Sequence, residues 1–128
     1  MANSNANILV SKLAAADLSS YQYYAVYLSA AETVNICNGY ANKPTGVLWD
    51  KPGAAGRGCL VCKGGETPVI LGGSVAAGDK IMVNATGQFI KTITGWPSYG
   101  EMMEAGSANE IRQAFIYPGM AGATNLSP

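Results

Sequence analysis

The residues of this 128-residue chain that could do chemistry begin with the cysteine pair Cys59-x-x-Cys62. A zinc site needs two further ligands, and only Cys37 remains, so a carboxylate would have to complete the set. A redox pair normally opens a helix, whose dipole stabilises the thiolate. Residues 59–62 instead have the composition of a strand, in which residues three apart point to opposite faces. We therefore expect small buried hydrophobic residues here, and no bound metal.

The second candidate is the pair Glu101 and Glu104, the only closely spaced carboxylates outside turns. On a strand these two side chains would also face opposite ways. The chain contains no histidine, which removes the commonest general base. A serine activated by a lysine is the remaining enzymatic alternative, and no local motif indicates it. We therefore expect a protein that is not an enzyme and that uses no cofactor.

Composition restricts the partners. Eight basic and eight acidic residues give zero net charge, and no segment concentrates the basic ones, so nucleic acid is not an expected partner. No apolar run reaches the ~20 residues of a membrane span. Only 12% of residues are charged, about half the usual share, which suits a surface partly covered by other chains. An odd number of cysteines favours a reducing compartment, so we expect synthesis in a cytoplasm.

The elements that must position these residues are short and β-rich. Runs of β-branched and aromatic residues alternate with glycine and asparagine turns, which predicts strands. Gly64-Gly65 between two apolar runs predicts a hairpin. The fold class expected is mainly β, a small antiparallel barrel or sandwich of about eight short strands with at most one short helix. The strands are expected near the following residues: 21–28, 33–37, 47–49, 59–62, 68–71, 80–84, 88–94 and 110–117.

Three regions follow from this pattern. Residues 1–20 form an N-terminal arm, flexible and partly disordered until bound, because a polar tip precedes the isolated apolar triplet at residues 8–10. Within the arm, residues 11–20 could form one or two helical turns. Residues 21–118 form the β domain, and residues 119–128 form a C-terminal tail. The open alternative for the arm is a terminus that packs on its own domain.

Several motifs, taken in order, resemble a family of tailed-bacteriophage capsid decoration (cement) proteins. Each motif alone is common, but five in the same order over roughly residues 14–117 are more specific. Trp49 before Asp50, and Glu101-Met102, depart from the family pattern. The motifs are Ala16-Asp17-Leu18-Ser19-Ser20 before an aromatic run, Thr33-Val34-Asn35-Ile36-Cys37, Gly46-Val47-Leu48-Trp49-Asp50-Lys51-Pro52, Ala76-Ala77-Gly78-Asp79-Lys80-Ile81 with Ala85-Thr86-Gly87, and Gly100-Glu101-Met102-Met103-Glu104-Ala105.

The resemblance implies a virion structural protein that stabilises the outer surface of the capsid by binding the major capsid protein. It implies an oligomer, for which a trimer is favoured over a dimer because shells offer three-fold sites. We expect the arm to supply the capsid contact, by adding a strand to an exposed sheet edge. The expected capsid-binding residues are Asn7, Ile8, Leu9, Val10 and Leu13.

A ligand-binding β module is the alternative function. Four tyrosines at positions 21, 23, 24 and 27, with Trp49 and Trp96, could form an aromatic face for glycans or host surfaces. Exposed rings over a groove would favour this alternative, and rings buried in a core would favour the structural role.

Overall fold

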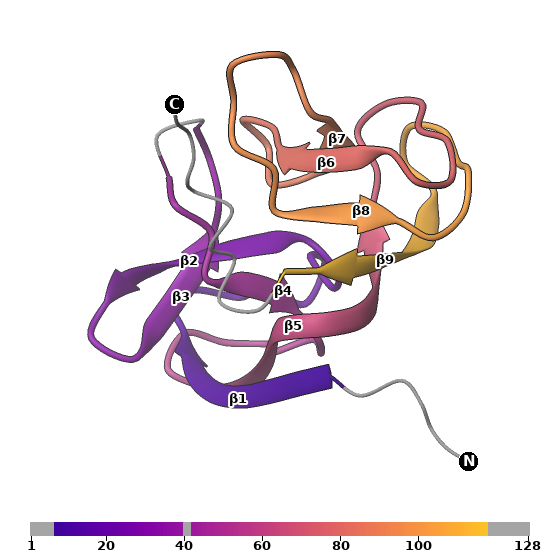
Figure 1. The fold of residues 1–128 in the computed structure, drawn as a ribbon. Helices are drawn as coiled ribbons and strands as arrows, with labels where there is room; N and C mark the ends of the chain where they lie inside the picture. Colours follow the sequence, from indigo (N-terminus) through magenta and orange to yellow (C-terminus); the bar gives the residue numbers. More distant parts are fainter. Residues whose placement is uncertain (1–6, 40–41, 118–128) are drawn as a thin grey trace.

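The computed structural model describes residues 7–39 and 42–117, and it confirms the mainly β fold class. Nine strands form one sheet, and no helix occurs among the described residues (Figure 1). In particular, no helix there is long and apolar enough to cross a membrane. The strands are β1 (Asn7–Ala14), β2 (Ala25–Ala30), β3 (Thr33–Ile36), β4 (Gly46–Leu48), β5 (Gly58–Ile70), β6 (Lys80–Val83), β7 (Phe89–Lys91), β8 (Gly100–Met102) and β9 (Ile111–Ile116).

Five strands close into a ring in the order β1-β3-β2-β4-β5, because β1 pairs with both β3 and β5. The β1–β3 pairing is parallel, whereas the other strand pairings in the sheet are antiparallel. Each strand of the ring contributes to one apolar cluster, which holds the ring together from the inside. Its buried members are Ala14, Leu18, Val26, Val34, Leu48, Cys59 and Val61.

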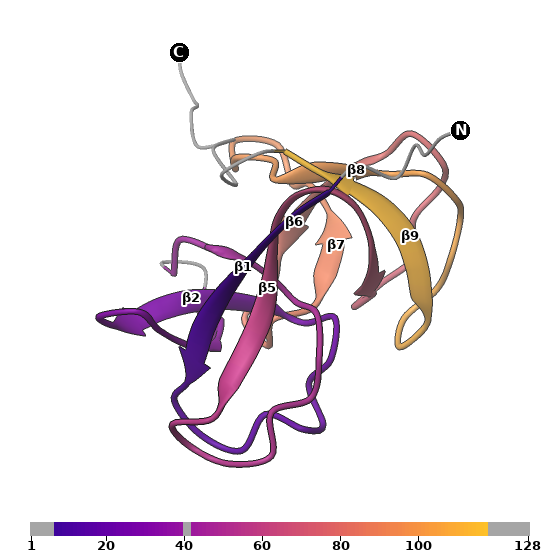
Figure 2. The same ribbon diagram turned by 90° about the horizontal axis from the view of Figure 1, so that it is seen from below.

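Strand β5 joins the ring to the rest of the sheet. Its first half pairs with β1 and β4, and its second half pairs with β9 from Gly65 to Ile70. Figure 2 shows the strand curving between these two sets of neighbours. The predicted hairpin at Gly64-Gly65 is therefore wrong. The two glycines permit a bend within one continuous strand, and Gly65, with a φ of 98°, occupies the left-handed region that favours glycine.

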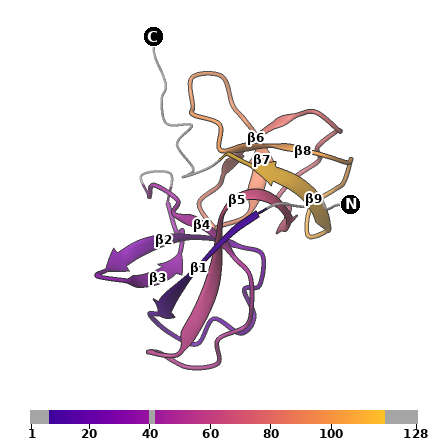
Figure 3. The same ribbon diagram turned by 60° about the horizontal axis from the view of Figure 1, so that its bottom comes forward.

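The second half of the sheet runs β9-β8-β6-β7 and lies to one side of the ring (Figure 3). A larger apolar cluster fills the space between the two halves. Phe89, Ile81 and Met102 come from the second half, and Val47 and Cys62 come from the opposite face of the ring strands. Neighbouring residues such as Val61 and Cys62 thus belong to different clusters, so β4 and part of β5 are buried on both faces.

The N-terminal region differs from the expected flexible arm. Residues 7–14 form β1, which aligns with β5 over seven residue pairs and sends Ala14 into the ring. Residues 1–6 of the predicted arm, and the predicted tail at 119–128, lie outside the described residues. The possible helical turns at residues 11–20 are replaced by the end of β1 and a bent loop. The pairing partner of β1 is about 50 residues away in sequence, so the local pattern alone did not indicate a strand.

Candidate functional site

All three cysteines are buried, and Cys59 and Cys62 face different clusters, as the sequence predicted for that pair. Cys59 belongs to the cluster inside the ring, whereas Cys62 and Cys37 belong to the cluster between the two halves. The Cys62 thiol donates to the Gly64 carbonyl at 3.3 Å. Burial raises the pKa of all three thiols, and that of Cys37 rises from 9.0 to about 12. A neutral, buried thiol is a poor nucleophile and a poor metal ligand.

The Cys37 thiol should therefore resist alkylation while the protein is folded. A pKa rise from 9.0 to about 12 lowers its thiolate fraction at pH 8 about 1,000-fold. We expect iodoacetamide to modify Cys37 at least this much more slowly in native protein than in protein unfolded by guanidinium, as measured by peptide mass spectrometry. Modification at equal rates would show that the thiol is accessible. Since the folded pKa is the higher one, the thiol also contributes stability that declines as the pH rises from 9.0 to about 12.

Glu101 and Glu104, whose side chains were predicted to point to opposite faces, each contact a different structural partner. Glu101 accepts a hydrogen bond from Lys80 Nζ at 3.2 Å, and that ammonium lies 5.6 Å from the centre of the Tyr117 ring. Glu104 Oε2 accepts from the Gln113 backbone N–H at 2.8 Å. Both contacts hold neighbouring strands or loops together. Among the described residues, no three cysteine or acidic side chains come close enough to hold a metal ion.

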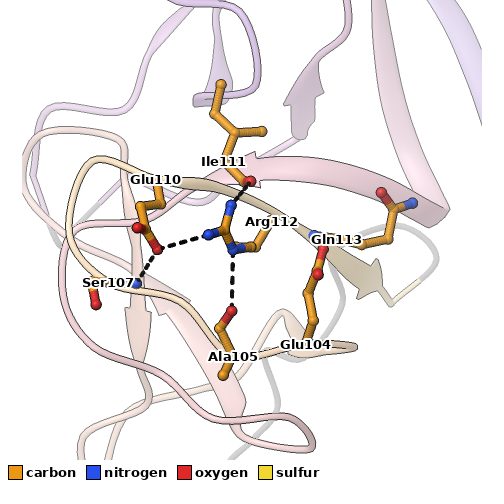
Figure 4. A network of polar contacts seen from close by, with 7 residues as sticks. All are labelled: Glu104, Ala105, Ser107, Glu110, Ile111, Arg112 and Gln113. Atoms are coloured by element: carbon orange, nitrogen blue, oxygen red, sulfur yellow. Dashed lines mark hydrogen bonds and ion pairs between the residues drawn. The ribbon is translucent and has the colours of Figure 1, made fainter.

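Arg112 organises the loop between β8 and β9, a contact set that the sequence did not reveal (Figure 4). Its guanidinium pairs with Glu110 at 3.2 Å and donates to the Ala105 carbonyl at 3.2 Å and the Ile111 carbonyl at 3.0 Å. Glu110 in turn accepts from the Ser107 backbone N–H at 2.8 Å. The network fixes the loop against β9, so Arg112 has a structural role.

The strongest candidate for an interaction surface is the outer edge of β1. Ser11 lies opposite Leu60, but Leu60 directs its carbonyl to Trp49 N–H and its own N–H to Asp50. The Ser11–Leu60 pair is therefore a non-hydrogen-bonded pair, in which the Ser11 backbone groups point away from β5. Two residues later, Leu13 N–H donates in that outward direction to the Glu32 carbonyl at 2.8 Å. Before Leu13, none of the described strands pairs with this edge.

The five predicted capsid-binding residues divide into two groups on β1. Ile8, Leu9 and Leu13 are exposed, at 50%, 37% and 44% of their surface. The ladder shifts register between Ile8 and Leu9, and this irregularity leaves both side chains outside. Val10 instead packs against the cluster inside the ring, and Asn7 donates its amide to the Glu66 carbonyl at 3.1 Å. Three of the five residues are thus exposed on β1, the strand with the open edge.

The aromatic residues do not form one continuous face. Tyr23 and Trp49 pack edge to face, with ring centres 6.4 Å apart, and both lie against the larger apolar cluster, as does Tyr27. Trp96 and Tyr21 are exposed, at 44% and 38%. Tyr21 and Tyr24 form a second edge-to-face pair with ring centres 5.0 Å apart, and this pair lines a cleft of about 660 Å³.

Together these features define a class: an all-β domain with a five-stranded ring and an exposed, apolar sheet edge. Comparison with solved structures gives a match to the crystal structure of the head fiber gp8.5 N base of bacteriophage phi29. The TM-score is 0.64, and the match covers 87% of this chain and 94% of that one at 16% sequence identity. At this identity the likeness establishes a shared fold. Neither a family model nor a curated protein sequence matches the chain.

Proposed function

We propose that this protein is a phage virion structural protein that decorates the outer surface of the capsid and stabilises the shell. The observation that carries the proposal is the fold shared with a phage head fiber base over almost the whole of both chains. The motifs that resemble decoration proteins support the same role independently of the structure. In this proposal the protein is not an enzyme, works without a cofactor, and resides on the virion after synthesis in the host cytoplasm.

The proposed capsid contact is made by β1. An unpaired strand edge is a template for another strand, and a strand of the major capsid protein could pair with the backbone groups of Ser11. The exposed side chains of Ile8, Leu9 and Leu13 would supply apolar contact beside these hydrogen bonds. Because β1 is already ordered against β5, binding would not carry the entropy cost of ordering a flexible arm.

The proposed oligomer is a homotrimer. Once the first copy of a trimer has bound at a three-fold site, its other two β1 edges are held near their own contact points. Their effective local concentration is therefore high. The gain in affinity from such linkage is ~100-fold or more without any new contact. Sedimentation equilibrium of the full chain checks this part of the proposal: we expect the mass of three chains, and a monomer or dimer would contradict the trimer.

A proline substitution tests the edge without removing the strand. Deleting residues 2–13 would remove most of β1 from the sheet, so a point change is sharper. Ser11→Pro removes an N–H that faces outward, while the hydrogen bonds from β1 to β5 come from other residues. We expect Ser11→Pro to weaken co-sedimentation with capsids of the phage at least about tenfold, since each copy loses one edge hydrogen bond and approach is blocked. The matched control, Ser11→Ala, keeps the N–H and should bind like the parent protein.

Thermal unfolding separates loss of binding from loss of fold. Both Ser11 variants should unfold within a few degrees of the parent protein, because Ser11 is exposed and its side chain has no partner among the described residues. A folded Ser11→Pro protein that binds capsids as tightly as the Ser11→Ala protein would rule out the β1 edge as the contact. If capsids bound neither the parent protein nor either Ser11 variant, decoration itself would be ruled out.

A further inference from the structure

The cleft beside Tyr21 and Tyr24 is built from three segments that are distant in sequence. They are the loop after β1, the end of β3 with the residues that follow it, and the turn between β6 and β7. Backbone contacts hold the segments together: Ala25 N–H donates to the Gly87 carbonyl at 2.9 Å, and Cys37 N–H donates to the Ala25 carbonyl at 3.0 Å. The cleft is therefore a fixed feature of the fold, and its volume of about 660 Å³ is typical of small-molecule sites.

The residues that line the cleft combine aromatic rings with neutral polar groups. Two rings from Tyr21 and Tyr24 stand edge to face, with an angle of 83° between their planes. Asn35 uses its side-chain oxygen to accept from Ile36 N–H at 2.9 Å, which leaves its NH₂ group without a protein partner among the described residues. The side-chain amide of Asn38 and both tyrosine hydroxyls also lack a protein partner there. The remaining polar lining residues are Asp17, Thr86 and Gln88.

Charge decides which ligand fits. No lysine or arginine is among the described residues that line the cleft, so an anionic ligand would find no counter-charge there. The one carboxylate, Asp17, already accepts from the Ser19 N–H at 3.0 Å and the Ser19 hydroxyl at 2.7 Å. Amides and hydroxyls, each able to donate and accept, suit a ligand that carries many hydroxyl groups. Aromatic rings offer an apolar surface for the C–H faces of such a ligand.

We propose that this cleft binds a neutral saccharide, held by the Tyr21–Tyr24 pair and by the amides of Asn35 and Asn38. The site lies apart from the proposed capsid contact, since no residue of β1 lines the cleft. This inference goes beyond decoration and does not require it, because the cleft belongs to a single chain.

Titration of the full chain by ¹⁵N–¹H correlation spectroscopy tests the site directly. The probes are three neutral oligosaccharides (maltotriose, lactose and triacetylchitotriose), with 3′-sialyllactose as an anionic probe and choline as a cationic one. We expect at least one neutral probe to bind with a Kd on the order of 1 mM. The shifted signals should be those of the cleft, above all the side-chain amides of Asn35, Asn38 and Gln88. The two charged probes should bind more weakly than the best neutral one.

Two matched variants complete the experiment. Tyr21→Ala removes a 38% exposed ring from the cleft and should weaken binding roughly tenfold. Trp96→Ala removes a similarly exposed ring that does not line the cleft and should leave binding unchanged. The proposal is overturned by any of four results: no shift with the neutral probes, shifts outside the cleft, equal binding by the Tyr21→Ala protein, or tighter binding of choline or sialyllactose. None of these outcomes bears on capsid binding, which is measured by sedimentation.

Discussion

Gly46→Ala should destabilise the protein by about 3 kcal/mol or more, although it adds only a methyl group. Gly46 lies in β4, between β2 and β5. A Cβ atom there would collide with the carbonyl oxygen of Cys62 and approach Val61 Cγ1 to 2.7 Å. The carbonyl belongs to the backbone of β5, where Cys62 is paired with β4 on one side and β1 on the other. The Cys62 carbonyl cannot move without opening the ring, so relieving the collision would itself destabilise the protein.

Urea unfolding of the parent protein and of the Gly46→Ala protein measures this loss of stability. We expect the Tm of the Gly46→Ala protein to fall by about 10 °C as well. Gly58→Ala is the matched control, because Gly58 lies in β5 and a Cβ atom there meets nothing within 4 Å. We expect the control to change stability by less than about 1 kcal/mol. Equal stability of the Gly46→Ala and Gly58→Ala proteins would mean that the β4–β5 contact is looser than the structure shows.

The sequence predicted best those strands that are marked by local alternation and by turn residues. Thr33–Ile36 alternates and is followed by an Asn-Gly turn, and Ile111–Ile116 ends at a Pro-Gly pair just beyond it. The two errors at β1 and β5 have a common cause. Whether Gly64-Gly65 closes a hairpin or bends one strand depends on which partner lies alongside, and the partners, β1 and β9, come from opposite ends of the chain. Such pairings leave no local signal.

Contacts between distant segments also limit what the sequence predicts of the candidate sites. The sequence indicated Asn7, Ile8, Leu9, Val10 and Leu13 as contact residues. Ile8, Leu9 and Leu13 are exposed on β1, whereas Val10 packs against the cluster inside the ring. That Ser11 directs its backbone outward follows only from the bonds of Leu60 to Trp49 and Asp50. The cleft beside Tyr21 and Tyr24 joins three segments through tertiary contacts, so only the tyrosines gave a sequence signal for it. The capsid contact itself remains a prediction.

Phe89→Ala should destabilise the protein by about 3–5 kcal/mol, the usual range for deleting a fully buried aromatic ring. Among the described residues, Phe89 has the largest fully buried side chain, with 0% exposure, and it lies in the cluster between the ring and the second half of the sheet. It pairs with Val83 of β6 and bridges to Leu71 just beyond the end of β5. Its removal would leave a cavity where the two halves meet, and residues held by two sets of strands cannot collapse into it.

Two variants at the same strand distinguish cavity formation from a general weakness of β7. Phe89→Leu keeps most of the apolar volume and should lose clearly less stability than Phe89→Ala. Lys91→Ala removes an exposed side chain whose closest acidic partner, Asp79, is 4.0 Å away, and should change stability by no more than about 0.5 kcal/mol. Urea unfolding orders the three proteins. If Phe89→Ala were as mild as Lys91→Ala, the ring could not be filling the space between the halves, and the two parts of the sheet would need another source of cohesion.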